Sequence, residues 1–584
     1  MLGKKTRSIG TFALGLVLAI AIYLIPGMTG IADAKEAFAE QVFAEEAFAK
    51  EVLAEEAVEG EGEPEIEWGQ DVFYKDWEGN PLKGPVSGYP APELGPEDYN
   101  NYEFAPSRII LWVANQQHLY FGSFVLAVPI FCMLIEFIGI RVREEDSVMA
   151  EKYDRLAKDL MKVSLTAYSW TAILGGILLF TFITLFPGFF KYMAGIFRPV
   201  MHVYALMFLA ESGVLYVYYY GWDKMKDDTF LKWIHCSLSV LLNLIGTVLM
   251  YLANSWATFM QAPGGIDSEG RFLGNIWHVI HSTLWNPVGV HRILGNIVFG
   301  GGIVGAYAAY HYLTAKNEEE RAHYDWVCYV AMFICIFGLI PLPFAGYWLM
   351  KEVYAFRQQM GITLMGGIMA WLFIIQAVMI GLLFFAANSY LHNGMARVKG
   401  SHRYMKYCKY MVLLLICCFT MWMTPHTIVM TPAELKAMGG AQHPIVGHFG
   451  VMSAKNTAVN LMITTTVLCF LLYQRANKKI TVPWATVGNC WIAAIFVGAA
   501  ANIIFLGVYG YALPANQRVG LSVPQVTTTL TTLFAGTAIN ISMFKNSESY
   551  GDIQWGTQSK VGTYAIFLLA ISFTWLMGLM GYIR

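Results

Sequence analysis

The sequence predicts an all-α polytopic membrane protein with about 12 transmembrane helices, preceded by an N-terminal signal or anchor helix. The first supporting observation is composition. Of 584 residues, 56% are hydrophobic and 14% are charged, whereas soluble proteins carry about 25% charged residues. The second is that apolar runs of about 20 residues, long enough to cross a bilayer, recur from Ser107 onward.

The N-terminal region has the pattern of an exported segment. Basic residues precede an apolar run at 9–31, and Ala32-Asp33-Ala34 follows, so residues 1–34 are expected to be a signal peptide or a signal anchor. Residues 35–106 are acidic and rich in Ala and Glu, then in Gly and Pro. Because they offer too little apolar surface for a core, we expect an exported, solvated arm that could dock on a partner.

The expected spans are 108–140, 163–187, 199–220, 234–256, 287–313, 325–345, 361–387, 409–425, 456–474, 484–508, 523–544 and 561–582. Basic residues cluster in alternate connections, at 141–162, 224–232, 397–409 and 475–479. The positive-inside rule places these connections in the cytoplasm. The exported arm then enters the first span from outside, which agrees with the charge distribution.

Several common site types are disfavoured by composition. The formal net charge of -2 gives no indication of nucleic-acid binding. The nine cysteines lie mostly in apolar spans without any CxxC or CxxCH motif. This pattern argues against zinc ribbons, iron–sulfur clusters and covalently attached haem.

The third span contains the most informative intramembrane residue, Glu211, with His202 near its outer end. A carboxyl in hydrocarbon is costly unless it faces a partner inside the bundle, so Glu211 is expected to belong to a functional site. The alternative is a protonated carboxyl that only bonds a neighbouring helix.

Histidines and methionines offer ligands for a metal or a haem. His118 lies near the outer end of the first span, with Glu136 toward its other end, while His291 and Met360 open the fifth and seventh spans. Imidazole and thioether groups are the axial ligands of membrane haems.

A further pair, His278 and His281, forms an HxxH in an outer connection. With His202, His443 or His448 this pair could hold copper or an additional haem. The favoured interpretation is a polar and aromatic surface loop that packs on a partner.

Over residues 107–475 the chain resembles subunit I of the cytochrome bd quinol oxidases. The resemblance rests on His118 followed by Glu136, on FLAESGVLYVYYYGWDKM (208–225) and on YLANSWATFMQAPGG (251–265). It rests also on NPVGVHRILGNIVFGG (286–301) and FRQQM (356–360). These segments occur in the same order as in that family.

The resemblance implies specific roles. His118 would ligate a high-spin haem b, and His291 with Met360 a low-spin haem b near the outer face, with a third haem of b or d type as an option. Met365 is the alternative to Met360, and Arg357 belongs to the same cofactor-binding segment. Glu211 would lie beside the oxygen-reactive haem or on its proton path from the cytoplasm.

The resemblance also implies a setting and partners. It places the chain in the bacterial inner membrane beside a second membrane subunit. The electron donor would be a quinol or a c-type cytochrome, and the acceptor dioxygen.

Departures from the family pattern leave three functions open. The second intramembrane Glu of the family is missing, and His202 is its candidate replacement. The long quinol-binding loop shrinks to about fifteen residues, no Gly-Arg-Gln-Pro-Trp follows the eighth span, and residues 476–584 add three spans. The first function is a terminal oxidase; the second is electron transfer between the quinone pool and a c-type cytochrome without oxygen reduction; the third is a haem-free transporter.

Overall fold

The computed structural model describes residues 105–267, 270–356, 370–398, 401–423, 452–476, 478–510, 512, 520–549 and 555–583. Within these ranges eleven helical spans are long and apolar enough to cross a membrane, and one of them, Glu318–Val353, consists of two consecutive helices. Ser522–Met543 is a further long helix, whose many threonines lower its hydropathy. Every predicted span overlaps a long helix, which confirms an all-α polytopic membrane protein.

The long helices are, in chain order, α2 (Ser107–Val142), α3 (Ser147–Leu185), α4 (Pro187–Met225), α5 (Thr229–Gln261), α7 (Trp285–Thr314), α8 (Glu318–Leu339), α9 (Leu342–Phe356), α11 (Ala370–Ala396), α13 (Cys408–Met423), α15 (Met452–Ala476), α16 (Ala485–Tyr509), α18 (Ser522–Met543) and α19 (Gly556–Ile583). Shorter elements are α6 (Ile276–Ile280), α12 (His402–Met405) and η4 (Phe544–Asn546). Strands β1 (Lys478–Ile480) and β2 (Ser547–Ser549) pair antiparallel, with Lys479 opposite Glu548.

Helix starts on the predicted cytoplasmic side are fixed by side-chain caps. Asp146 accepts a hydrogen bond from the Met149 amide at 3.0 Å and Asp228 from the Leu231 amide at 2.8 Å, which satisfies backbone donors that a helix leaves unpaired. The cap at Asp146 makes α3 longer than its expected span. Much of the basic segment at 141–162 is therefore helical.

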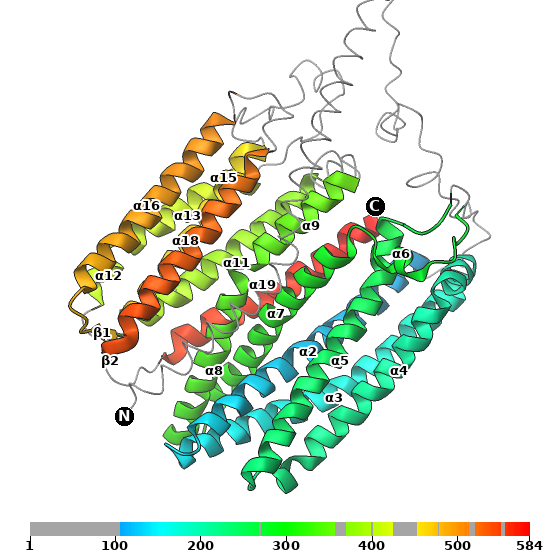
Figure 1. Cartoon of the computed structure of the whole chain (residues 1–584), viewed down its shortest axis with the longest axis horizontal. Coiled ribbons are helices and arrows are strands. Elements are labelled where there is room, and N and C mark those ends of the chain that lie inside the picture. The colour runs from blue at the N-terminus through cyan, green and yellow to red at the C-terminus, as the bar shows by residue number, and fades with distance from the viewer. Residues whose placement is uncertain are drawn as a thin grey trace, which may run out of the picture. The chain divides into compact units, whose positions relative to one another are not determined.

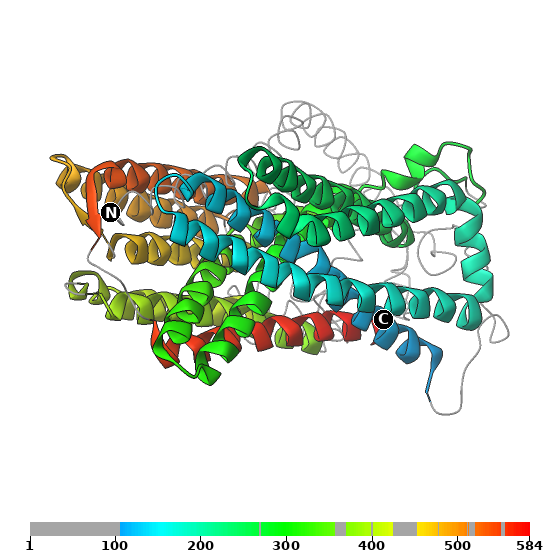
Figure 2. The same cartoon turned by 90° about the horizontal axis from the view of Figure 1, so that it is seen from below.

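The helices form two groups (Figures 1 and 2). The α2/α7 group comprises α2, α3, α4, α5, α7, α8, α9 and α19, and the α15 group comprises α13, α15, α16 and α18. Helix α11 packs against α19 of the first group and against α13 and α15 of the second. The most apolar windows of α2 and α7 are each 67% buried and that of α15 is 72% buried, against 17% for α3 and α4. Helices α2, α7 and α15 are therefore the central helices, and α3 and α4 are peripheral.

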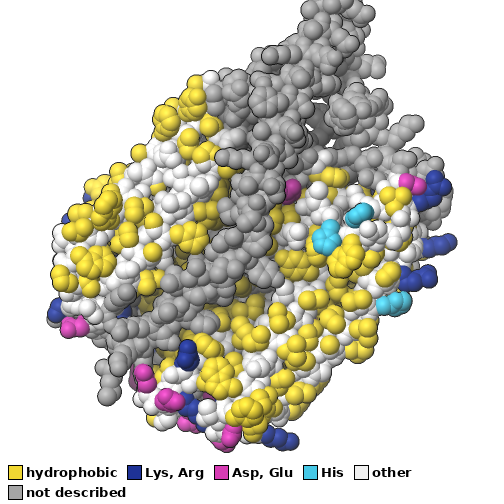
Figure 3. Space-filling view, viewed as in Figure 1, with side chains coloured by type: hydrophobic (Ala, Val, Ile, Leu, Met, Phe, Trp, Pro, Cys, Tyr) yellow, Lys and Arg dark blue, Asp and Glu magenta, His cyan; other side chains and the backbone are white. Residues whose placement is uncertain are grey.

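The peripheral helices present apolar side chains outward. Phe180 of α3 and Leu209 of α4 are each 66% exposed, and hydrophobic side chains spread widely over the face in Figure 3. Such surface fits contact with lipid or with another membrane subunit.

The C-terminal helix α19 packs against α2, α7, α8 and α11, far from it in sequence. Lys560 forms an ion pair with Asp325 of α8 at 2.7 Å, and both side chains are buried. The Tyr120 hydroxyl of α2 donates to the Ile571 carbonyl at 2.7 Å. The last helix of the chain is therefore part of the α2/α7 group.

Candidate functional site

His118 lies on the face of α2 that meets α3. Its Nδ1 is 3.2 Å from the carbonyl oxygen of Thr171, to which it donates in the corresponding tautomer. Across from the ring, a Cβ at Gly175 would lie 3.0 Å from His118 Cε1, so the missing side chain makes room for the imidazole. No hydrogen bond to Nε2 occurs among the described residues. A histidine anchored at one nitrogen and open at the other has the arrangement of a metal ligand.

His291 lies near the start of α7, facing α9. A Cβ at Gly346 would lie 3.7 Å from His291 Nε2 and Cδ2, so only a glycine flanks this edge of the ring. Neither ring nitrogen has a hydrogen-bond partner within the described ranges. His291 therefore also offers an unengaged imidazole nitrogen.

Arg292 and Asn254 adjoin His291 and were not singled out from the sequence. The Arg292 guanidinium donates to Asn254 Oδ1, and no carboxylate pairs with Arg292 in the part of the chain that the structure describes. Asn254 is fully buried, and its Nδ2 has no partner among the same residues. A cation and a spare donor beside an open imidazole fit a cofactor that carries acid groups, as haem does.

Glu211 is on the buried side of α4, with a relative exposure of 6%. A Cβ at Gly246 of α5 would lie 3.0 Å from Glu211 Oε1. The carboxyl makes no hydrogen bond or ion pair with any residue that the structure describes. The alternative in which Glu211 joins two helices through a hydrogen bond therefore gains no support from these contacts.

His202 does not approach Glu211. Its side chain is exposed, and the nine residues between the two positions rotate them to opposite faces of a helix with about 3.6 residues per turn. His202 and Glu211 therefore lie on opposite faces of α4, and a role for His202 in place of the second carboxyl stays a prediction.

The HxxH histidines lie at α6 and are exposed. His281 Nδ1 donates to the Trp277 carbonyl at 3.0 Å, and the ring packs edge-on against Trp285. Among the described residues no group of three His, Cys, Asp or Glu side chains could hold a metal ion. Arg357, Met360, Met365, His443 and His448 lie outside the described residues.

The sequence analysis missed a buried polar cluster, which we call the Glu136 cluster: Glu136, Asp154, Tyr218, Trp222, Lys232 and His235. Glu136 Oε1 is 2.7 Å from Lys232 Nζ and 2.5 Å from His235 Nδ1, and Tyr218 donates to Oε2 at 2.7 Å. Lys232 also pairs with Asp154. The sequence analysis places Lys232 in the cytoplasmic connection 224–232, but the residue is only 5% exposed. The pattern Lys-x-x-His at the start of a span was the available indication.

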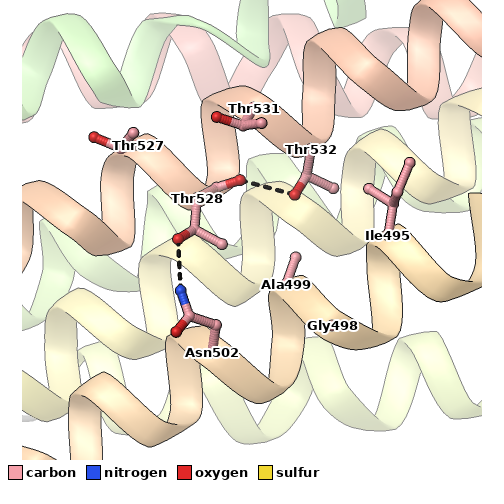
Figure 4. Close-up of a pocket in the computed structure, with 8 residues that line it drawn as sticks. All are labelled: Ile495, Gly498, Ala499, Asn502, Thr527, Thr528, Thr531 and Thr532. Atoms are coloured by element: carbon pink, nitrogen blue, oxygen red, sulfur yellow. Dashed lines mark hydrogen bonds between the residues drawn. The ribbon is translucent and has the colours of Figure 1, made fainter.

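A surface pocket between α16 and α18 has a different character (Figure 4). It is lined by Ile495, Gly498, Ala499, Asn502, Thr527, Thr528, Thr531 and Thr532. Asn502 Nδ2 donates to Thr528 Oγ1 at 2.8 Å. This pocket holds hydroxyl and amide groups but no titratable side chain, so it offers no acid, base or strong metal ligand.

The comparisons with known proteins give one family. The model of cytochrome bd terminal oxidase subunit I matches residues 107–370, which contain His118, Glu211 and His291. A solved structure, that of bd oxidase from Geobacillus thermodenitrificans, is similar with 12% sequence identity and a TM-score of 0.39, covering 75% of this chain and 97% of that chain. No curated protein matches the chain. Residues 107–370 of this chain are therefore similar to subunit I of the cytochrome bd terminal oxidases.

Proposed function

We propose that this chain is the haem-binding subunit of a respiratory membrane oxidoreductase. It receives electrons at the outer face from a quinol or a c-type cytochrome and reduces dioxygen with protons taken from the cytoplasm. The observation that carries the proposal is His118, held at Nδ1 by the Thr171 carbonyl with Nε2 unengaged among the described residues. The family match over the same region supports it.

His118 and His291 would hold the haem irons, with Met360 or Met365 as the second ligand at His291. Bound haem would supply one-electron and oxygen chemistry. Arg292, held by Asn254, would neutralise acid groups of the cofactor. Glu211, buried in apolar surroundings, would take up a proton when an added electron makes its surroundings more negative.

A second membrane subunit would complete the machinery. The family that matches this chain is described as a subunit I, and the exposed apolar faces of α3 and α4 offer area for a membrane partner. The arm at 35–106, of which the structure describes only residues 105 and 106, is a candidate docking element. A fully active, monodisperse single chain would contradict this part of the proposal.

The second candidate is an electron-transfer subunit that does not reduce oxygen. It is favoured by the short connection after the sixth span, where the quinol-oxidase family has a long quinol-binding loop. Here α9 (Leu342–Phe356) directly follows α8. Quinol oxidation at this position is therefore the least supported part of the first candidate.

Two measurements decide between these functions. A reduced-minus-oxidised spectrum of the purified complex should contain haem b bands, whereas a haem-free transporter would give none. Oxygen uptake is then compared with a quinol and with reduced cytochrome c as donors. The oxidase proposal requires uptake with at least one donor. Haem bands that donors reduce but oxygen does not reoxidise would favour the electron-transfer subunit.

A further inference from the structure

The Glu136 cluster is an unusual arrangement for the interior of a membrane protein. It draws Glu136 from α2, Asp154 from α3, Tyr218 from α4, and Lys232 and His235 from α5. Glu136 and His235 side chains are 0% exposed. Buried ion pairs are weak contributors to stability because desolvation offsets their attraction. Stability alone therefore does not explain why these charged side chains are buried in the Glu136 cluster.

The net charge of the Glu136 cluster allows it to bind one additional proton. Lys232 contributes +1 and the carboxylates of Glu136 and Asp154 contribute -2, so the sum with neutral His235 is -1. One further proton makes the cluster neutral, which a low-dielectric interior favours.

The position of that proton follows from the geometry of His235. Its Nε2 is 2.8 Å from the Tyr218 carbonyl oxygen, which can only accept, so Nε2 carries a hydrogen. Nδ1 faces Glu136 Oε1 at 2.5 Å. The additional proton therefore lies between Nδ1 and Oε1, where either the imidazole or the carboxyl can hold it.

The cluster lies on the same buried stripe of α4 as Glu211. Glu211, Leu215, Tyr218 and Trp222 are all buried, and the seven residues from Glu211 to Tyr218 correspond to about 10 Å along the helix. The basic connections at 141–162 and 224–232 place the cluster toward the cytoplasm. It thus lies between Glu211 and the side from which protons would enter.

Polar side chains continue along α5 from the cluster toward Glu211. Ser239 and Asn243 follow His235 at intervals of four residues, about 6 Å each, and Gly246 abuts the Glu211 carboxyl. Asn243 Nδ2 donates to the Ser239 carbonyl at 2.8 Å and to the Pro129 carbonyl of α2 at 3.2 Å. These intervals are short enough for hydrogen-bonded water molecules to bridge.

We propose that the Glu136–His235 pair stores the proton that Glu211 takes up, and that Asp154 and Lys232 pass it in from cytoplasmic water. This inference rests on the proposed function. Asp154 is the entry because its side chain is 23% exposed, against 6% for Lys232. In each cycle one proton enters at Asp154 and one reaches the Glu211 carboxylate. Only O–H and N–H bonds form and break, and no electron is transferred within the relay.

The test uses the full complex in proteoliposomes, with its haem reduced by a light-driven electron donor. Infrared difference spectroscopy follows the protonated carboxyl of Glu211, identified as the band that Glu211→Gln removes. His235→Gln keeps hydrogen-bonding groups but cannot hold the extra proton. We expect it to slow the rise of the Glu211 band by about tenfold or more, the scale of a lost acid–base group.

Two further variants separate the relay from a structural role. Thr181→Val removes the 2.8 Å hydrogen bond from a buried hydroxyl of α3 to the Ile177 carbonyl, outside the Glu136 cluster, so the rate should stay within about twofold of the wild type. The double variant Glu136→Gln/Lys232→Met removes opposite charges together and leaves Asp154, which is 23% exposed and accepts a hydrogen bond from Trp222, as the remaining charge of the cluster. It should slow the rise as His235→Gln does, with unchanged haem content.

The outcomes are distinguishable. A Glu211 band that rises at the wild-type rate in His235→Gln or in the double variant, with an intact haem spectrum, overturns the relay and leaves the proposed function standing. Equal slowing by Thr181→Val would show that the loss of any buried polar contact in these helices slows the band, and it also overturns the relay. A wild-type complex without haem bands overturns the proposed function, and the relay with it.

Discussion

The two helix groups bury different kinds of polar side chain. Both groups bury hydroxyls and amides, but among the described residues only the α2/α7 group also buries acids and a histidine. These are Glu136, Glu211, Asp325 and His235, beside the cations Lys232 and Lys560. In the α15 group the buried polar side chains are mostly hydroxyls and amides that bond one another. Gln525 donates to Thr457 at 2.8 Å, and Thr529 to Asn460 at 2.8 Å. The buried cations of that group, Lys455 and Arg475, lie near the two ends of α15.

This difference in buried side chains indicates different roles for the two helix groups. A neutral hydrogen bond between threonine and asparagine holds two helices together, but it stores no proton and ligates no iron. The titratable groups cost more to bury, and in a membrane such groups mark functional pathways. The proposed cofactor and proton chemistry therefore belongs to the α2/α7 group, and we expect a mainly structural role for the α15 group.

The largest expected effect is on stability, at the ion pair that joins α8 to α19. Asp325→Ala leaves Lys560 buried without its partner, which should lower the free energy of unfolding by about 3–5 kcal/mol. Thermal unfolding in detergent measures the loss. Asp325→Ala/Lys560→Met should recover most of it, and full stability of the single variant would contradict the assigned ion pair.

The next effect is on turnover at Glu211. Glu211→Gln keeps the shape of the side chain but cannot exchange a proton, so turnover should fall at least about tenfold. Insertion and haem content, checked by spectra, should be unchanged. Wild-type turnover in this variant would show that Glu211 is a structural residue. It would then give no support for a functional difference between the two helix groups.

A smaller effect is expected in the α15 group. Thr529→Val removes the hydrogen bond to Asn460 and should cost about 0.6 kcal/mol, the average for such bonds within membranes. Turnover should not change. Thr527→Val, at an exposed position on the same helix, is the matched control. A loss of turnover in Thr529→Val alone would show that the α15 group takes part in the chemistry.

The smallest effect is expected at the glycines beside the two imidazoles. Gly175→Ala would place a Cβ 3.0 Å from His118 Cε1, whereas the Cβ of Gly346→Ala would lie at an ordinary 3.7 Å from His291. Gly175→Ala should therefore shift the absorption of the His118 haem, and Gly346→Ala should leave both haem bands in place. The opposite ranking would show that the two rings are oriented differently.

The fold could be predicted from the sequence because hydropathy determines which segments cross a membrane, and every expected span overlaps a helix. The lengths of the helices could not be predicted from hydropathy, because α3 begins at the Asp146 cap, well before its apolar run. The packing of α19 against α2 could not be predicted from the sequence either. It depends on contacts between residues far apart in sequence, such as Lys560 with Asp325.

Site residues were predictable only where one residue is conspicuous by itself. Glu211 stands alone in an apolar run and is buried as expected. The positive-inside rule places Lys232, Arg475 and Lys478 in cytoplasmic connections, yet all three are buried. The positive-inside rule assigns a side of the membrane and not a depth. The Glu136 cluster is assembled from four helices, and only Lys232 and His235, three residues apart, form a local pattern in the sequence.

The most direct test of the central claim, haem binding by the α2/α7 group, is a reduced-minus-oxidised spectrum of His291→Ala. A matched control is His311→Ala, which changes a histidine at the other end of α7 where the ring stacks on Tyr324. We predict that His291→Ala inserts normally but loses the low-spin haem b bands, while His311→Ala keeps them. Full haem content and unshifted bands in His291→Ala, and likewise in His118→Ala, would contradict the account.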